Sequence, residues 1–494
     1  CSYHLQEAGA TPEEELAFAL ANAIAVLDAV KAGGAITDAD FPQLVGRISF
    51  FVNAGIRFVT ELCKMRAFAE LWDEITSERY GVKDPKMRRF RYGVQVNSLG
   101  LTEQQPENNV YRILIEMLAV VLSKNARARA VQLPAWNEAL GLPRPWDQQW
   151  SIRLQQIMAF ESDLLEYGDL FDGSAEVEAK VAALKADARA ELARIDEMGG
   201  SVAAIPYMKR RLVESNAYRI AAIETGDKKV VGVNCFTEGE PSPFTGAADS
   251  FLSIDEDTEE RQIASLNAWR DRRNGAQAKL ALVELEAAAR EGRNLMEPSI
   301  VCAHAGVTTG EWGQALREVY GEYRSPTGVA ASKAQAGGDG LAALLGRVES
   351  LVAKHGLRPR ILIGKPGLDG HSNGAEQIAV RARDAGFEVI YEGIRLTPEQ
   401  IVRTAVEENP HVVGLSVLSG SHLALVTAVK TGLDAAGMGD TPVVVGGIIP
   451  PGDADILRAA GIVRIYTPKN FNMNAVMADI LDLVEQRLPV PGAE

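Results

Sequence analysis

In the first third of the chain, short apolar runs alternate with longer segments whose apolar residues recur at helical spacing. The short runs are typical of buried strands in a parallel sheet, and the longer segments of helices that cover it. A threonine, a proline and three glutamates at 11–15 mark the start of the first long helix. The expected strands are 1–4 (a strand end), 46–53, 90–96 and 129–133, and the expected helices are 11–31, 56–80, 109–123 and 151–167.

These strand–helix units recur about every 40 residues, which predicts a parallel sheet or a βα barrel. A closed barrel needs eight units, and about four can be found. Half a barrel would expose a large apolar edge, and the chain begins with Cys1 rather than Met. We therefore expect that an upstream part is missing: the other half of the barrel, on the same polypeptide or on a separate chain.

The last third of the chain repeats the rhythm with five apolar runs, at 360–364, 387–391, 412–417, 443–446 and 462–466. This pattern predicts a flavodoxin-like, five-stranded doubly wound sheet, which binds ligands at the carboxyl ends of its strands. The region between is helical, acidic and alanine-rich, and we expect it to pack and connect. The expected domains are thus a half-barrel at 1–167, a mostly helical linker region at 168–354 and an α/β domain at 355–494.

Composition removes several function classes. A formal net charge of −15 disfavours nucleic acid as a partner. The four cysteines are scattered without CxxC spacing, which argues against zinc and iron–sulfur sites and fits a reducing cytosol. No apolar run reaches transmembrane length and no signal peptide is visible. We expect a cytoplasmic protein without a membrane partner.

The segment 365–374, KPGLDGHSNG, follows the first strand of the C-terminal unit and contains the pattern D-x-H-x-x-G. A histidine on such a loop is a candidate metal ligand. Asp369 lies two residues before His371 and is placed to accept the proton of its other ring nitrogen, which fixes the ring and raises its basicity. Further candidates follow the later strands: Ser416 with Leu418, Gly446 with Gly447, and Tyr466 with Thr467.

Three signals occur in order: D-x-H-x-x-G, then S-x-L after 41 residues, then G-G after 27 more. This combination resembles the cobalamin-binding domain of B12-dependent mutases and of methionine synthase. The resemblance implies that His371 is the lower ligand of the cobalt, with Asp369 and Lys365 behind it, and that the nucleotide tail of the cofactor lies beside S-x-L and under G-G. The residues expected to bind the cofactor here are Lys365, Asp369, Gly370, His371, Gly374, Ser416, Leu418, Gly446, Gly447, Tyr466 and Thr467.

Residues 2–11, SYHLQEAGAT, resemble a strand-end segment of the adenosylcobalamin-dependent acyl-CoA mutases, the methylmalonyl-CoA mutase family. The resemblance implies adenosylcobalamin as cofactor, an acyl-CoA substrate and a TIM-like (β/α)8 barrel, of which this chain holds the C-terminal half. It makes Tyr3 and His4 catalytic, with Tyr3 near the adenosyl group and His4 at the thioester carbonyl. The other residues carried over are Glu7 and Glu138 for the cofactor and Arg47, Ser49 and Gln95 for the substrate.

Two stretches depart from methylmalonyl-CoA mutase. Gly93 stands where that enzyme has a substrate-facing histidine, and 132–134 reads QLP where it has His-Thr-Asn. Both stretches look like the ethylmalonyl-CoA mutase branch, which implies interconversion of ethylmalonyl-CoA and methylsuccinyl-CoA by a radical mechanism. The alternatives are methylmalonyl- or isobutyryl-CoA mutase and, from a different class, a corrinoid-binding carrier protein. We also expect a homodimer.

Overall fold

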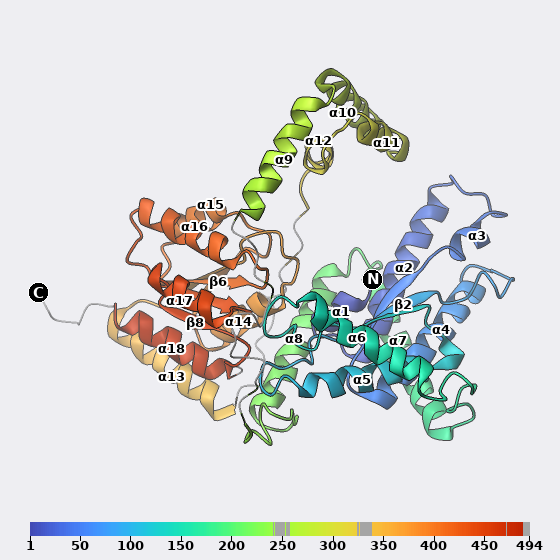
Figure 1. The fold of residues 1–494 in the computed structure, drawn as a ribbon, viewed down its shortest axis with the longest axis horizontal. Helices are drawn as coiled ribbons and strands as arrows, with labels where there is room; N and C mark the ends of the chain where they lie inside the picture. The colour runs from blue at the N-terminus through green and yellow to red at the C-terminus, as the bar shows by residue number, and fades with distance from the viewer. Residues whose placement is uncertain are drawn as a thin grey trace, which may run out of the picture. The chain divides into compact units, whose positions relative to one another are not determined.

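The computed structural model describes residues 1–240, 242, 252, 257–323, 326, 338–470 and 472–487. The chain divides into two compact units, one formed by Cys1–Leu252 with Pro326–Glu494 and the other by Ser253–Ser325. Figure 1 shows the course of the chain through the helices and strands of both units. Among the described residues, no helix is both long and apolar enough to cross a membrane.

The N-terminal part of the larger unit is built on a parallel sheet with strand order β1-β2-β3. Long helices separate its strands, and the apolar faces of these helices form one core with the sheet. The register aligns Asn53 of β1 with Gln95 of β2, and Gln95 with Gln132 of β3. The elements are α1 (Tyr3–Glu7), α2 (Pro12–Ala32), α3 (Phe41–Val45), β1 (Phe50–Ala54), α4 (Phe58–Glu78), β2 (Tyr92–Val96), α5 (Asn108–Val121), η1 (Lys124–Ala126), β3 (Ala130–Gln132) and α6 (Pro145–Phe160).

Three expected boundaries here were wrong. Residues 1–4 are not a strand end: the helix α1 begins at Tyr3, and the described part of this sheet has three strands instead of four. The strand expected at 46–53 begins only at Phe50, because α3 extends to Val45 and ends there. The helix expected at 151–167 starts earlier, at Pro145, where a proline and Asp147 close its first turn.

The two helices that follow pack on the N-terminal sheet, and the second of them also contacts the C-terminal part. Helix α7 (Ala175–Glu197) and helix α8 (Ile205–Glu224) add Val181 and Leu212 to the core of the N-terminal sheet. Helix α8 also packs on α14 (Asn373–Asp384) of the C-terminal part, where Lys209 pairs with Glu376 at 2.7 Å. The expected linker region therefore contributes residues to the cores of both α/β parts.

The C-terminal part is a five-stranded parallel sheet with order β5-β4-β6-β7-β8, which confirms the doubly wound prediction. The five strands lie within two residues of the expected positions: β4 (Arg360–Gly364), β5 (Glu388–Tyr391), β6 (Val412–Val417), β7 (Val443–Gly447) and β8 (Arg464–Tyr466). The chain reverses its direction of winding between β4 and β6, which places the ligand crevice at the carboxyl ends of these two strands.

Successive side chains of the strands point to opposite faces of this sheet, and each face has its own core. Helices α13 (Gly338–His355), α14 and α18 (Met473–Glu485) cover one face. Helices α15 (Pro398–Glu408), α16 (His422–Ala435) and α17 (Pro451–Ala459) cover the other (Figure 1).

The smaller unit is helical. It contains α9 (Thr258–Arg272), α10 (Gly275–Arg290), α11 (Met296–His304) and α12 (Thr309–Tyr320). Its small core is formed by Ala281, Leu285, Cys302 and Ala315. None of the residues predicted to form the site lies in this unit.

Candidate active site

On the loop after β4, His371 is held by hydrogen bonds to Asp369, which in turn pairs with Lys365. Lys365 is fully buried and donates from Nζ to Asp369 Oδ2 at 2.5 Å. The other oxygen, Oδ1, accepts from the His371 backbone N–H at 3.0 Å and lies 2.7 Å from His371 Nδ1. Burial opposes ionisation of Asp369, but the hydrogen bonds from His371 and Lys365 hold its pKa well below the ordinary value. The hydrogen bond to Asp369 in turn raises the pKa of His371.

This arrangement leaves Nε2 as the ring nitrogen that can meet a ligand. The His371 side chain is 47% exposed, and Asp369 fixes the tautomer with the proton on Nδ1. Among the described residues, no group of three or more His, Cys, Asp and Glu side chains could hold a metal ion.

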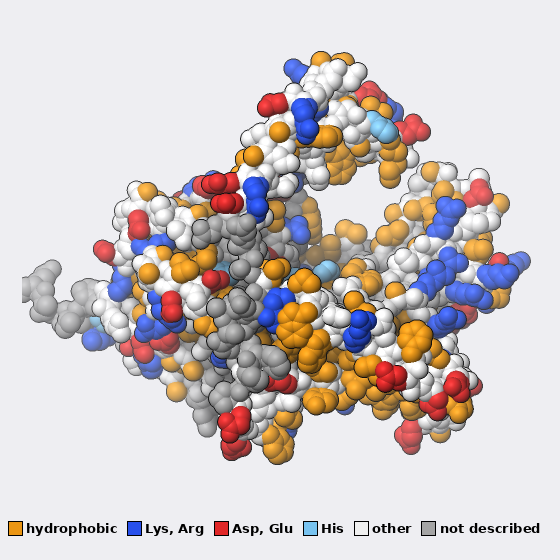
Figure 2. All heavy atoms as spheres, in the orientation of Figure 1, with side chains coloured by type: hydrophobic (Ala, Val, Ile, Leu, Met, Phe, Trp, Pro, Cys, Tyr) orange, Lys and Arg blue, Asp and Glu red, His pale blue; other side chains and the backbone are white. Residues whose placement is uncertain are grey.

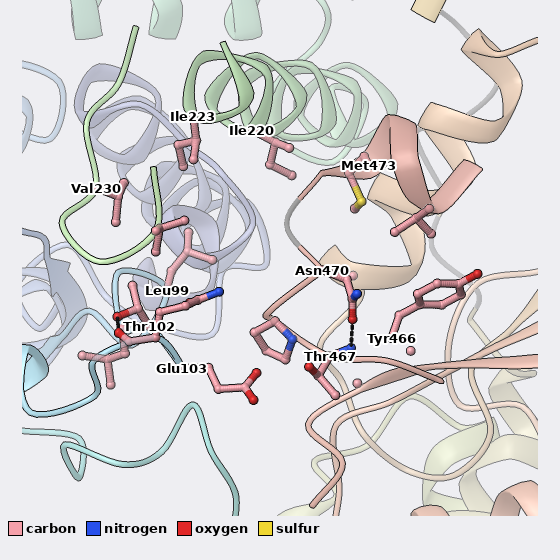
Figure 3. A pocket seen from close by; sticks show the side chains of 18 of the residues that line it. Leu99, Thr102, Glu103, Ile220, Ile223, Val230, Tyr466, Thr467, Asn470 and Met473 are labelled. Carbon is pink, nitrogen blue, oxygen red and sulfur yellow. Dashed lines mark hydrogen bonds between the residues drawn. The ribbon is translucent and has the colours of Figure 1, made fainter. Parts of the chain in front are cut away.

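A cavity of about 770 Å³ opens beside this loop, at the carboxyl ends of the strands (Figure 3). Its lining is mostly apolar, which suits a flat heteroaromatic group more than a sugar or a free phosphate. Of the predicted cofactor residues, those on its wall are Gly374, Ser416, Leu418, Gly446, Gly447, Tyr466 and Thr467. In Figure 3, Ile220 and Ile223 of α8 close the cavity from one side and Met473 of α18 from another.

The two adjacent glycines of β7 have different roles. A Cβ on Gly446 would meet no protein atom within 4 Å, so it would project into the cavity itself. A Cβ on Gly447 would lie 1.8 Å from the carbonyl oxygen of Val417 on β6, so this glycine allows the two strands to pair. The open Cβ position of Gly446 leaves room for the predicted approach of a bulky group to the backbone, while Gly447 allows the two strands to pair.

Tyr3, His4 and Glu7 lie on α1, against the same loop. The rings of His4 and His371 have centroids 6.2 Å apart, and those of Tyr3 and His4 are 5.1 Å apart. Tyr3 Oη lies 3.3 Å from Ser98 Oγ, which donates to Glu7 Oε1 at 2.8 Å. Burial raises the pKa of Tyr3, which keeps its hydroxyl protonated as a donor.

Glu138 belongs to the same group of charges. Burial and the nearby Glu7 raise its pKa to about 7, while His371 acts in the opposite direction. The backbone oxygen of Glu7 also accepts a hydrogen bond from Asn373 Nδ2, which joins α1 to the start of α14. The predicted residues around the cofactor's reactive face are thus brought together from segments more than 350 residues apart.

The residues present fit a corrin. The free Nε2 of His371 and the open Cβ position of Gly446 suit the cofactor. The ring centroids of His4 and His371 are 6.2 Å apart, so these two rings would have to separate to admit a planar group between them.

Two of the three predicted substrate residues lie elsewhere. Arg47 and Ser49 are exposed and precede β1, so they lie at the amino edge of the sheet, opposite to Tyr3 and His371. Gln95 is half-buried near the carboxyl end of β2. At Gly93 the ring of Phe51 fills the space: a Cβ there would lie 3.2 Å from it.

Sequence reasoning missed several contributors to the site. Ser98 follows β2 just as the other site residues follow their strands, so the same rule could have found it. Asn373 lies inside the motif segment. The contribution of α8 to the cavity left no signal in the sequence, because its apolar residues look like ordinary core positions.

Comparison with known proteins agrees with this geometry. Residues 1–322 match the family model for methylmalonyl-CoA mutase, and residues 359–483 match the B12 binding domain. The chain is 62% identical over 486 residues to an ethylmalonyl-CoA mutase of Cereibacter sphaeroides, a match covering 98% of this chain and 74% of that protein. It is 60% identical over 496 residues to an ethylmalonyl-CoA mutase of Methylorubrum extorquens (100% and 72%) and 35% identical over 494 residues to the methylmalonyl-CoA mutase of Escherichia coli (98% and 67%). Because one family model covers most of the chain and the relatives share at least 35% identity over nearly all of it, the chain belongs to the methylmalonyl-CoA mutase family and carries its B12 binding domain.

Proposed function

We propose that this chain binds adenosylcobalamin and interconverts ethylmalonyl-CoA and methylsuccinyl-CoA by migration of the thioester carbonyl group. The observation that carries the proposal is the Lys365–Asp369–His371 relay, which presents a single histidine nitrogen beside an apolar cavity and opposite His4. When bound, the cofactor supplies the radical that starts the rearrangement. The roles below belong to residues of this chain.

His371 would hold the cobalt through Nε2, with Asp369 keeping the proton on Nδ1. His4 would donate a hydrogen bond to the thioester oxygen, whose charge changes during migration. Tyr3, held by Ser98, would border the adenosyl group and limit where it moves. Glu7 and Glu138 would accept hydrogen bonds from the ribose.

Two observations support ethylmalonyl-CoA over methylmalonyl-CoA as substrate. Two relatives named ethylmalonyl-CoA mutase are 60–62% identical to this chain, whereas two relatives named methylmalonyl-CoA mutase are 35% identical to it. The ring of Phe51 also lies over Gly93, so a histidine at this position, as in methylmalonyl-CoA mutase, would need that ring to move. Arg47, Ser49 and Gln95 remain predicted substrate contacts.

The decisive experiment is turnover by the adenosylcobalamin-loaded protein with ethylmalonyl-CoA and methylmalonyl-CoA in parallel, followed by mass spectrometry of the acyl-CoA products. We expect methylsuccinyl-CoA from the first and at least about tenfold lower kcat/KM with the second. Preference for methylmalonyl- or isobutyryl-CoA would replace the substrate assignment. Tight cobalamin binding without turnover of any acyl-CoA would favour the corrinoid carrier.

The expected partners are part of the proposal. Exposed apolar side chains gather on α6, among them Trp146, Trp150, Ile157 and Phe160 (Figure 2). A further half-barrel, on the same or another polypeptide, would cover this surface. Turnover that appears only after the upstream half of a relative is added would support it. A homodimer and a cytoplasmic location stay predictions, checked by light scattering and by cell fractionation.

A further inference from the structure

A buried cluster of charge lies beneath α1. Lys64, on α4, is fully buried, and its ammonium nitrogen lies 2.6 Å from Glu15 Oε2, 2.5 Å from Glu61 Oε2 and 2.9 Å from the backbone oxygen of Asn53. Glu15 is also fully buried, and Glu61 is nearly so. Burial raises the pKa of Glu15, while the charge of Lys64 opposes that shift. Such a cluster is costly to bury unless its charges are closely paired, and here both carboxylates share the single ammonium of Lys64.

Both carboxylates reach onward to α1. Glu15 Oε1 accepts a hydrogen bond from Ser2 Oγ at 2.8 Å, and Glu61 Oε1 accepts one from Gln6 Nε2 at 3.0 Å. Ser2 and Gln6 are four positions apart, so their side chains project from the same face of this one-turn helix.

The residues between these two anchors carry the proposed chemistry. Helix α1 has five residues and no side-chain hydrogen bond at its N-cap, so its own sequence does little to fix its orientation. Tyr3 and His4 lie within it, and the ring of His4 faces that of His371. The orientation of these two rings therefore depends on what holds the two ends of the turn.

We propose that Lys64 is a positioning residue for Tyr3 and His4. It acts through its two carboxylate partners, which fix the two ends of α1 by their bonds to Ser2 and Gln6. The role of the segment in catalysis rests on the proposed function, but the anchoring of α1 by Lys64 does not.

Helix α4 offers a matched control. Arg66 lies two positions from Lys64 and forms a comparably short ion pair with Asp169, at 2.6 Å, with side chains that are 9% and 1% exposed. This pair joins α4 to the loop before α7, where Arg66 also donates to the backbone oxygen of Phe171. Its loss should destabilise the protein without reaching α1.

The first test is hydrogen–deuterium exchange of the peptide covering residues 2–8, in the purified full chain without substrate. K64M should exchange several-fold and up to about tenfold faster there than wild type, the range that the net loss of one ordinary hydrogen bond allows. R66M should leave exchange in this peptide unchanged. A second variant, S2A/Q6L, removes the anchors on α1 while keeping the ion cluster, and should exchange as fast as K64M.

The second test is steady-state kinetics of the adenosylcobalamin-loaded enzyme with the proposed acyl-CoA substrate. A misplacement of about 1 Å costs up to about 100-fold in rate, so kcat should fall by this order in K64M and S2A/Q6L. KM and the cobalamin dissociation constant should change less than about threefold, and R66M should keep wild-type kcat.

Wild-type exchange and kcat in S2A/Q6L would overturn the proposal, even if K64M fails to fold. An equal loss of kcat in R66M at matched melting temperature would also overturn it, because general destabilisation would then account for the effect. If wild type itself turns over no acyl-CoA, the proposed function fails, and the exchange experiment still decides whether Lys64 anchors α1.

Discussion

Replacing Asp369 with asparagine tests the relay behind the proposed cobalt ligand. Both carboxylate oxygens of Asp369 face donors: Lys365 Nζ at 2.5 Å on one side, and the backbone N–H and Nδ1 of His371 on the other. An asparagine offers one oxygen and one NH2 group, so one side must lose its acceptor. Lys365 is fully buried and would be the costlier charge to leave unpaired, so the remaining oxygen should turn toward it.

The NH2 group would then face His371 Nδ1 and favour the tautomer with the proton on Nε2, the nitrogen that must bind the metal. Losing one charge-assisted hydrogen bond costs about 1.5–3 kcal/mol, and comparable changes behind a metal ligand weaken binding by about 10- to 100-fold. We therefore expect D369N to bind adenosylcobalamin about 10- to 100-fold more weakly than wild type, in titrations followed by absorbance.

The same substitution should change the pH dependence of binding. Asp369 raises the pKa of His371, and a proton on Nε2 competes with the metal. Wild-type affinity should thus fall as the pH drops through this raised pKa. In D369N, which lacks the carboxylate, that fall should occur at lower pH.

The C-terminal sheet contains a matched control. His422 Nε2 lies 2.7 Å from Asp453 Oδ2, in a His–Asp pair that is away from the lining of the cavity. D453N removes the same kind of hydrogen bond and should leave cobalamin affinity within about threefold of wild type. Unchanged affinity in D369N, or an equal loss in D453N, would refute the relay.

Substitutions at three other places test folding, cofactor binding and catalysis separately. E138Q should remove a pH dependence of the stability of the apo-protein. The Glu138 carboxyl keeps its proton up to about pH 7 in the folded state but only to about pH 4.5 in the unfolded chain, so wild type loses up to about 3 kcal/mol of folding free energy as the pH rises through that window. Melting curves with a pH-independent difference between the two proteins would contradict the raised pKa. G446V should have the melting temperature of wild type yet bind cobalamin at least about tenfold more weakly. G447A should lower the melting temperature because its Cβ meets a backbone oxygen. The reverse pattern would exchange the roles of the two glycines. H4A should reduce kcat by about 100-fold or more with little change in cobalamin affinity, and wild-type turnover would remove His4 from the mechanism.

Local pattern was sufficient for much of this protein. The five strands of the C-terminal sheet were located because each is a short, largely apolar run between turn residues, and the three central strands are mostly buried. The relay was predictable because Asp369 and His371 are two residues apart on one loop, where short-range geometry brings their side chains together. The open position at Gly446 was predictable because a glycine at the end of a strand leaves the backbone without a Cβ.

Boundaries were less predictable where competing structures use similar residues. Residues 1–4 look like a strand end, but in the structure α1 begins at Tyr3. The carboxylates that accept hydrogen bonds from Ser2 and Gln6 lie on α2 and α4. Gly447 was predicted for the ligand site and does line the cavity, but only the distance from its Cβ position to the backbone of β6 showed that strand pairing also requires a glycine there.

The sequence by itself determined the types of elements, the cobalamin motif and the order of the parts, because these depend on residues that are near one another in the chain. The tertiary structure decided what meets across long separations: His4 with His371, Glu7 with Asn373, and α8 with the cavity. It also decided that Lys64, a residue type that is usually exposed, is sealed beneath α1. Burial depends on every element that packs around a position, and no local pattern contains that information.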